Sequence, residues 1–168
     1  MKPAERIEVD LARQRLTLYA PGMPPRVYPV STAAAGPGER SGSGCTPRGR
    51  HVVRAKIGAG LAAGAVLAGR RPTGETWTPE LAGAHPDRDW ILSRVLWLSG
   101  TERGRNRLGE VDTMRRYIYI HGTPEEDRLG TPVSHGCIRM SNADVIDLFD
   151  RVPAGTEVVI LEGGERDS

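Results

Sequence analysis

The sequence contains few aromatic residues and almost no cysteine. Phe, Trp and Tyr make up 5% of the 168 residues, and the two cysteines are Cys45 and Cys137. Two cysteines allow one disulfide at most, so a fold held together by several cross-links is excluded. In a reducing cytosol we expect both to be free thiols, because disulfides persist mainly in oxidising compartments.

Long apolar runs are also absent. The longest, from Gly58 to Gly69, is interrupted by glycines and is shorter than the roughly 20 residues that a membrane-spanning helix needs. The first residues, Met1–Arg6, contain no apolar segment of the kind found in a secretory signal. We therefore expect no membrane partner and, if Met1 is the native start, a cytoplasmic location.

No charge of one sign dominates the chain. The 23 basic and 21 acidic residues give a formal net charge of +2, which does not indicate a nucleic-acid partner or an anionic membrane surface. The length suits one domain with its own core. We assign residues 1–162 to this domain and residues 163–168, which are polar, to a flexible tail. The sequence does not predict the oligomeric state.

Periodicity predicts a chain made mainly of strands. Arg6–Leu11 alternates apolar and polar residues, as a half-buried strand does, and a second strand after a short turn completes a hairpin. Pro29 places the third strand at an edge or a bulge. A helix begins after Ser141 as N-cap and stops before Pro153. The remaining strands are predicted at residues 15–19, 26–31, 90–98, 117–120 and 157–161. The pattern therefore predicts a mainly β sandwich with one or two helices.

A long loop rich in Gly, Pro and Ser interrupts this pattern between Thr32 and Gly49. A loop of this length inside a compact domain is either functional or disordered. No Pro/Gly-rich linker separates two domain-sized segments, so we do not interpret the loop as a domain linker.

The most informative residues are His121-Gly122 and, further along, Ser134-His135-Gly136-Cys137. A cysteine and a histidine brought together are the minimum for catalysis by a thiolate nucleophile. A free thiol has a pKa of about 8.5, so an imidazole that accepts its proton activates it. Glycine beside the nucleophile lets a substrate carbonyl approach the main-chain N–H groups, which can hold an oxyanion.

These two segments resemble the L,D-transpeptidase catalytic domain family (YkuD-like). A histidine-glycine pair, a spacer and the run Ser134-His135-Gly136-Cys137 match the motif of that family, and Arg139 stands where many members have asparagine. The segment from Thr46 to Val53 resembles a second family segment that leads into a strand bordering the cleft, which implies that the loop before it is a wall of the cleft. The resemblance implies a YkuD-like β-sandwich of mixed sheets with one or two helices.

The resemblance also implies roles for individual residues. Cys137 is the expected nucleophile, His121 the general base, and Gly122 the carbonyl that orients His121. We expect His135 to shape the pocket, to polarise Cys137 or to contact the substrate, and the N–H groups of Gly136 and Cys137 to form the oxyanion hole. Ser134 and Arg139 are candidates for substrate binding or for bracing of the loop, and Arg48 and Arg50 are candidates for binding a substrate carboxylate.

The implied substrate is a peptidoglycan fragment, a muropeptide with a tetrapeptide stem. Together with the expected cytoplasmic location, this predicts an L,D-carboxypeptidase that removes terminal D-alanine during wall recycling, through a Cys137 thioester resolved by water. Two alternatives are an L,D-transpeptidase with the same acyl-enzyme and a non-catalytic peptidoglycan-binding module. Retained Cys137 and His121 argue against the binding module. No cofactor is expected.

A zinc site is the main chemical competitor, since His121, His135 and Cys137 are residue types that bind zinc. The sequence has no C-x₂-C and no H-E-x-x-H motif. A fourth ligand would have to come from Cys45, His51 or His85. We therefore predict no metal.

Overall fold

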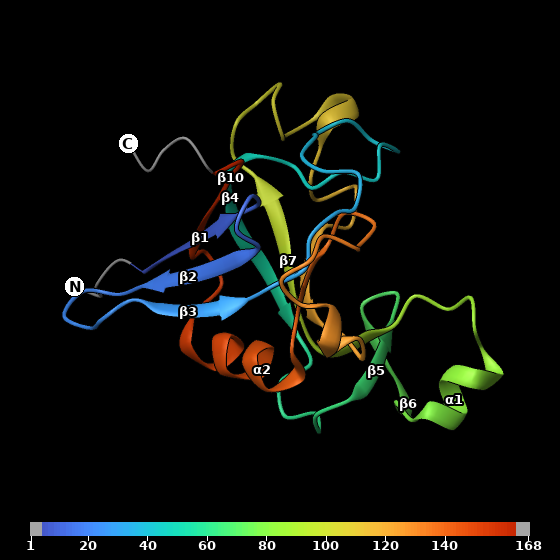
Figure 1. Cartoon of the computed structure of the whole chain (residues 1–168). Coiled ribbons are helices and arrows are strands. Elements are labelled where there is room, and N and C mark those ends of the chain that lie inside the picture. The colour runs from blue at the N-terminus through green and yellow to red at the C-terminus, as the bar shows by residue number, and fades with distance from the viewer. Residues whose placement is uncertain (1–4, 164–168) are drawn as a thin grey trace.

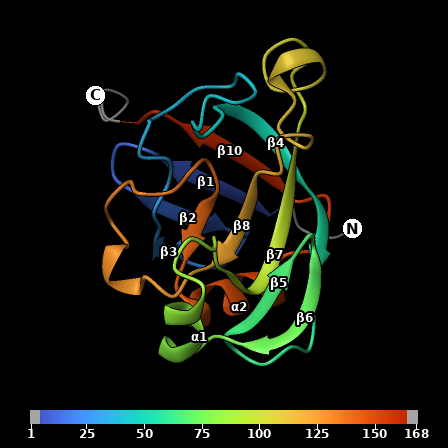
Figure 2. The same cartoon turned by 90° about the vertical axis from the view of Figure 1, so that its right-hand side faces the viewer.

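The computed structural model describes residues 5–163 (Figures 1 and 2). Ten strands and two α-helices make up this part of the chain, together with two short 3₁₀ turns at residues 109–111 and 126–128. The elements are β1 (Arg6–Asp10), β2 (Arg15–Tyr19), β3 (Arg26–Pro29), β4 (Gly49–Ile57), β5 (Ala65–Ala68), β6 (Arg71–Thr76), α1 (Pro79–Ala84), β7 (Ile91–Gly100), β8 (Tyr119–Gly122), β9 (Ile138–Met140), α2 (Asn142–Arg151) and β10 (Glu157–Leu161).

All ten strands belong to one mixed sheet, which curls over its core. The order along the main path is β3-β2-β1-β10-β4-β7-β5-β6, and β8 and β9 continue from the other edge of β7. In Figure 1, β1, β2 and β3 lie across the view while β7 stands steeply behind them, so the direction of the strands changes strongly along the sheet. The mainly β, single-domain architecture is confirmed, with two layers made by one curled sheet.

The core lies where this sheet meets α2, which packs against β7 and β8. Val145, Leu148 and Phe149 are the buried residues of the helix, and they join a cluster with buried residues of β1, β2, β7, β8, β9 and β10. The hydroxyl of Ser141 accepts a hydrogen bond from the N–H of Asp144, as expected for an N-cap. β7 is buried along most of its length, because it has strand neighbours on both edges.

Several sequence predictions are confirmed. β1 and β2 form the antiparallel hairpin, β3 with Pro29 is the edge strand, and β10 covers residues 157–161. The strand expected at 117–120 begins two residues later, because Tyr117 has a left-handed φ of 58° that no regular strand accepts. The predicted 90–98 strand runs from Ile91 to Gly100. β5, β6, β9 and α1 were not predicted.

None of the helices within residues 5–163 has the length and apolar content to cross a membrane. The predicted flexible tail, residues 163–168, lies outside the described residues except for Gly163.

Candidate active site

Strand pairing brings the two predicted catalytic residues together. β8 and β9 are parallel neighbours, with His121 opposite Arg139, and Cys137 directly precedes β9. His121 and Cys137 line the same cavity of about 180 Å³. Seven other residues complete its lining: Asp89, Arg116, Tyr117, Ile118, Ser134, His135 and Arg139.

The imidazole of His121 is held in one tautomer. Its Nδ1 lies 2.7 Å from the carbonyl oxygen of Gly122, and because a carbonyl only accepts, Nδ1 carries the proton and Nε2 has the free lone pair. The ring is 1% exposed, and burial lowers its pKa, although Gly122 and Asp89 act in the opposite direction. The imidazole is therefore neutral at pH 7 and can accept a proton at Nε2.

Gly122 has a second property that the motif requires. A Cβ at this position would lie 2.7 Å from the carbonyl oxygen of Leu92, so the close packing of β8 against β7 leaves no room for a side chain. The carbonyl that orients His121 is thus fixed by a residue that must be glycine.

The thiol of Cys137 is held by the irregular segment that leads into β8. Its Sγ accepts the N–H of Tyr119 at 3.3 Å and lies 3.4 Å from the carbonyl oxygen of Tyr117. Burial raises the pKa of Cys137 to about 11, while the N–H of Tyr119 and the guanidinium groups of Arg139 and Arg116 act in the opposite direction. In the resting protein the thiol is therefore protonated beside a neutral imidazole.

The turn before Cys137 is closed by Ser134. Its hydroxyl donates to the carbonyl of Cys137 at 2.6 Å and accepts the N–H of Gly136 at 3.2 Å. This geometry fits a role for Ser134 in bracing the turn. Because the N–H of Gly136 is directed at Ser134, the N–H of Cys137 is the better placed candidate for an oxyanion donor.

His135 and Arg139 lie on either side of the nucleophile. His135 is exposed and, like Cys137, lines the catalytic cavity, although the segment that joins them is a turn and not an extended strand. The Arg139 side chain is 9% exposed and forms ion pairs with Glu125 at 3.1 Å and Asp89 at 3.4 Å. Its guanidinium is thus tied to two loops, which fits the bracing alternative for Arg139.

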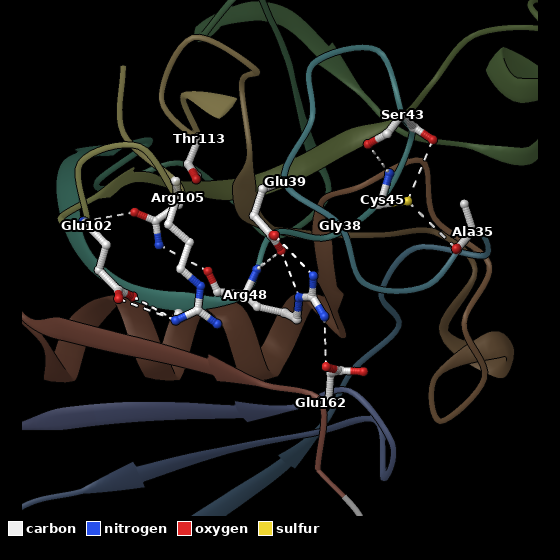
Figure 3. Close-up of polar contacts among 12 residues, drawn as sticks. Ala35, Gly38, Glu39, Ser43, Cys45, Arg48, Glu102, Arg105, Thr113 and Glu162 are labelled. Atoms are coloured by element: carbon white, nitrogen blue, oxygen red, sulfur yellow. Dashed lines mark hydrogen bonds and ion pairs between the residues drawn. The ribbon is translucent and has the colours of Figure 1, made fainter. Parts of the chain in front are cut away.

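Arg48 and Arg50 do not line this cavity, so the structure does not bring them together with the other predicted site residues, and their role in substrate binding stays a prediction. They line a separate groove with Glu102 and Glu162. Figure 3 shows the guanidinium of Arg48 between Glu39, at 2.8 Å, and Glu162, at 2.7 Å. A side chain engaged by two carboxylates has little capacity left for a third.

Arg116, Asp89 and Tyr117 line the cavity and were missed by the sequence analysis. None of them belongs to the two matched segments. Arg116 and Tyr117 come from the irregular stretch before β8, and Asp89 from the loop before β7. No periodicity or spacing in the sequence could have indicated their positions, because these depend on how the sheet curls.

The two cysteines are free thiols. The Sγ of Cys45 lies 3.7 Å from the carbonyl oxygens of Ala35 and Ser43, within its own loop (Figure 3). Within residues 5–163 no three His, Cys, Asp or Glu side chains are arranged to hold a metal ion.

A larger cavity of about 420 Å³ adjoins the catalytic one and shares Asp89, His135 and Arg139 with it. Its other walls combine Trp77 and Trp90 with further side chains, among them the carboxylates of Asp87 and Glu125. Arg88 also lines it, but its guanidinium is paired with Glu75 at 2.6 Å. The two cavities together could hold two peptide segments on either side of His135.

Comparison with known proteins gives one family. The family described as L,D-transpeptidase catalytic domain (YkuD) matches residues 4–160. Over 47 residues, 28% of this chain, the sequence is 51% identical to YqjB of Bacillus subtilis and 45% identical to the probable L,D-transpeptidase YbiS of Escherichia coli. These segments make up 27% and 15% of the two relatives, so the match spans well under half of either protein.

Solved structures share the fold over almost the whole chain. An L,D-transpeptidase from Mycobacterium smegmatis aligns with a TM-score of 0.56 at 20% identity, covering 95% of this chain and 59% of the other. L,D-transpeptidase 3 from Mycobacterium tuberculosis, in complex with a faropenem-derived adduct, aligns with a TM-score of 0.57 at 19% identity, covering 95% and 61%. At these identities the likeness concerns the fold alone.

Proposed function

Since this chain belongs to the family of L,D-transpeptidase catalytic domains, we propose that it transfers the acyl group of a peptidoglycan stem peptide through a thioester on Cys137. One observation carries the proposal: the thiol of Cys137 and the imidazole of His121, with its Nε2 free, line the same small cavity. The nucleophile, the base and the carbonyl that orients the base are thus arranged as covalent catalysis requires.

The first half-reaction forms the acyl-enzyme. Nε2 of His121 takes the thiol proton as Sγ attacks the carbonyl carbon of the third stem residue, and the N–H of Cys137 faces the oxyanion. The C–N bond then breaks, and the same proton goes to the amine of the departing D-alanine. A thioester on Cys137 and a neutral imidazole remain.

The second half-reaction transfers the acyl group to an amine of another stem. The amine attacks the thioester carbon, gives its proton to His121, and the C–S bond breaks; the proton returns to Sγ. The adjoining 420 Å³ cavity supports this route, because it shares Asp89, His135 and Arg139 with the catalytic cavity. An acceptor there would lie next to the thioester.

Hydrolysis of the same thioester is the second candidate. Water in place of the amine makes the protein an L,D-carboxypeptidase, and a cytoplasmic location would make muropeptides of wall recycling its substrates. The observation in its favour is the open, shared wall at His135, which is exposed and leaves the cavity accessible to water.

Incubation with a disaccharide-tetrapeptide, with and without a second stem or a free D-amino acid, tests both fates by mass spectrometry. We expect release of D-alanine and, when an amine acceptor is present, a cross-linked or exchanged product. A tripeptide as the sole product would identify the carboxypeptidase.

The Cys137→Ala variant is the control for this experiment. It removes the nucleophile and little buried volume, so it should keep the fold and lose all turnover. Binding of the substrate without turnover by the unmodified protein would leave only the peptidoglycan-binding module.

A further inference from the structure

The guanidinium of Arg116 lies in the wall of the catalytic cavity without a carboxylate partner. Nη1 donates to the carbonyls of Gly38, at 3.3 Å, and Glu39, at 3.2 Å. Nη2 donates to the carbonyl of Cys45 at 2.6 Å and reaches the hydroxyl of Ser43 at 3.5 Å. Every described partner of this cation is thus a neutral oxygen.

The nearby acidic side chain is held elsewhere. The carboxylate of Glu39 is bound by Arg48, with contacts of 2.8 and 3.1 Å to its guanidinium (Figure 3), while only the backbone carbonyl of Glu39 reaches Arg116. Arg139, the other arginine of the cavity, is paired with Glu125 and Asp89. Arg116 is therefore the one cation of the cavity lining that has no ion pair among the described residues.

A half-buried cation without a counter-ion is costly, and an anion that enters the cavity compensates it. The position relative to the nucleophile is suitable for such an anion. A Cβ on Gly136, the residue before Cys137, would lie 3.9 Å from Nη2 of Arg116. The cation thus flanks the site where the scissile carbonyl must approach Sγ.

The proposed substrate has an anion close to its scissile carbonyl. In a tetrapeptide stem the terminal carboxylate is three bonds beyond the scissile carbonyl carbon, and backbone bond lengths of about 1.3–1.5 Å place it roughly 3–4 Å away. Guanidinium groups bind carboxylates through paired N–H donors. In Arg116 the Nε–H has no hydrogen-bond partner among the described residues, and the contact of the adjacent Nη2 with Ser43 is long, at 3.5 Å. A stem that continues beyond the fourth residue, or that ends in an amide, lacks this charge.

We propose that Arg116 binds the α-carboxylate of the departing D-residue and thereby selects stems that end one residue after the scissile bond. This inference rests on the proposed function, since it assigns the ligand of the same site. It makes Arg116 the residue that distinguishes a tetrapeptide donor from a longer or amidated one.

The test compares two tetrapeptide donors, one ending in D-alanine and one in D-alaninamide, with the unmodified protein and Arg116→Gln. The unmodified protein should prefer the free carboxylate in kcat/KM by about 10- to 100-fold, as expected for a charge-assisted hydrogen bond. Arg116→Gln should lose that preference, because its kcat/KM should fall for the carboxylate donor and stay unchanged for the amide donor. Arg116→Lys, which keeps the charge, should retain part of it.

Arg115→Gln is the matched control, because Arg115 is the exposed neighbour and does not line the cavity. It should leave the preference unchanged. If Arg116→Gln lowers kcat/KM equally for both donors, the inference is overturned, because the substitution then acts through the loop or the thiol. A preserved preference would overturn it as well.

A binding measurement separates this inference from the proposed function. With Cys137→Ala, calorimetry should show weaker binding of the amide donor than of the carboxylate donor, and adding Arg116→Gln should make the two equal. Absence of D-alanine release by the unmodified protein would refute the proposed function. Equal binding of both donors by Cys137→Ala alone would refute the proposed role of Arg116.

Discussion

At the scale of single residues, the site consists of a neutral thiol and a neutral imidazole. Burial raises the pKa of Cys137 to about 11 and lowers the pKa of His121, so neither group is charged at pH 7. A stable thiolate–imidazolium pair is therefore not the resting state. Under the proposed function the proton moves when the substrate arrives, and His121 acts as a general base in the sense of proton transfer during attack.

This predicts how iodoacetamide labels Cys137 as the pH changes. In a Cys45→Ala background, where Cys137 is the one thiol, the labelling rate should keep rising well above pH 8.5, the pKa of an ordinary cysteine. The reason is the energetic cost of a thiolate in this buried site. A rate that reaches its plateau below pH 8 would contradict it and would indicate a preformed ion pair.

The role of His121 gives a second prediction. His121→Ala should slow the formation of the acyl-enzyme by about 10²–10⁴-fold, the usual contribution of a general base. Rapid mixing with a stem peptide, followed by mass spectrometry of the intact protein, measures this step directly. His85→Ala, an exposed histidine outside the cavity, is the control. Near-normal acylation by His121→Ala would refute the assignment of the base.

At the scale of elements, the loop of residues 32–48 is an ordered support for the catalytic turn. Thr46 is fully buried; its hydroxyl accepts the N–H of Ala33 at 3.0 Å and donates to the carbonyl of Gly136 at 2.9 Å. Isolated bridges also join Ala33 to Ser134 and Ser31 to Arg139. The loop thus holds the carbonyl of Gly136, the residue next to the nucleophile.

Thr46→Val tests this support. Valine fills the same space but leaves a buried N–H and a buried carbonyl without partners, at a cost of about 1–3 kcal/mol each. We expect a lower free energy of unfolding in urea and a lower kcat, since the turn at Gly136 loses its anchor. Thr101→Val removes an exposed hydroxyl that also donates to a carbonyl and should cost much less. Equal effects of the two variants would argue against the loop as a support.

The elements that the sequence predicted are those with a buried face. β1, β2 and β10 alternate between buried and partly exposed positions, and α2 has its apolar residues on one side. β6 is exposed along almost all its length and α1 has no buried residue, so hydrophobic periodicity could not predict either one. α1 is specified by its ends instead, with Thr78 as N-cap and Pro79 in the first turn.

The candidate site, like the fold, was predicted only in part. The motif predicted that His121 and Cys137 would meet, and one parallel strand pair accomplishes this. Of the two arginines that line the cavity, the motif indicated Arg139 but not Arg116. Arg48 and Arg50 lie in a family-like segment but line another groove, while Arg116 reaches the cavity from a stretch without a pattern.

At the scale of the whole molecule, a buried histidine outside the catalytic cavity couples the fold to pH. His51 is fully buried in β4, with Nδ1 donating to the carbonyl of Gly49 and Nε2 accepting from the hydroxyl of Thr113, both at 3.0 Å. Burial lowers the pKa of His51 to about 4. The unfolded chain takes up a proton near pH 6.5 that the folded protein binds only near pH 4.

Stability should therefore fall as the pH decreases through this window. Between about pH 6.5 and 4 the unfolded state binds more protons than the folded state, so the free energy of unfolding decreases, by about 3 kcal/mol for His51 alone. The lowered pKa of His121 acts in the same direction. Urea unfolding at several pH values measures the slope.

His51→Gln is the variant that isolates this effect. Its stability should be lower at pH 7 but should depend less on pH between 6.5 and 4, whereas His85→Gln should keep the slope of the unmodified protein. An unchanged slope in His51→Gln would show that other groups cause the loss in acid.

The pairing of β1 with β10 has a consequence for how the chain folds. The hairpin of β1 and β2 joins neighbouring segments, but the other edge of β1 is covered by residues 157–161, which lie far along the chain and must come back to pair. Until then β1 and β4 each present an unpaired edge, the kind of surface that invites association with other chains. Closure of the sheet therefore depends on a contact between segments that are distant in the sequence, and such contacts form more slowly than a local hairpin.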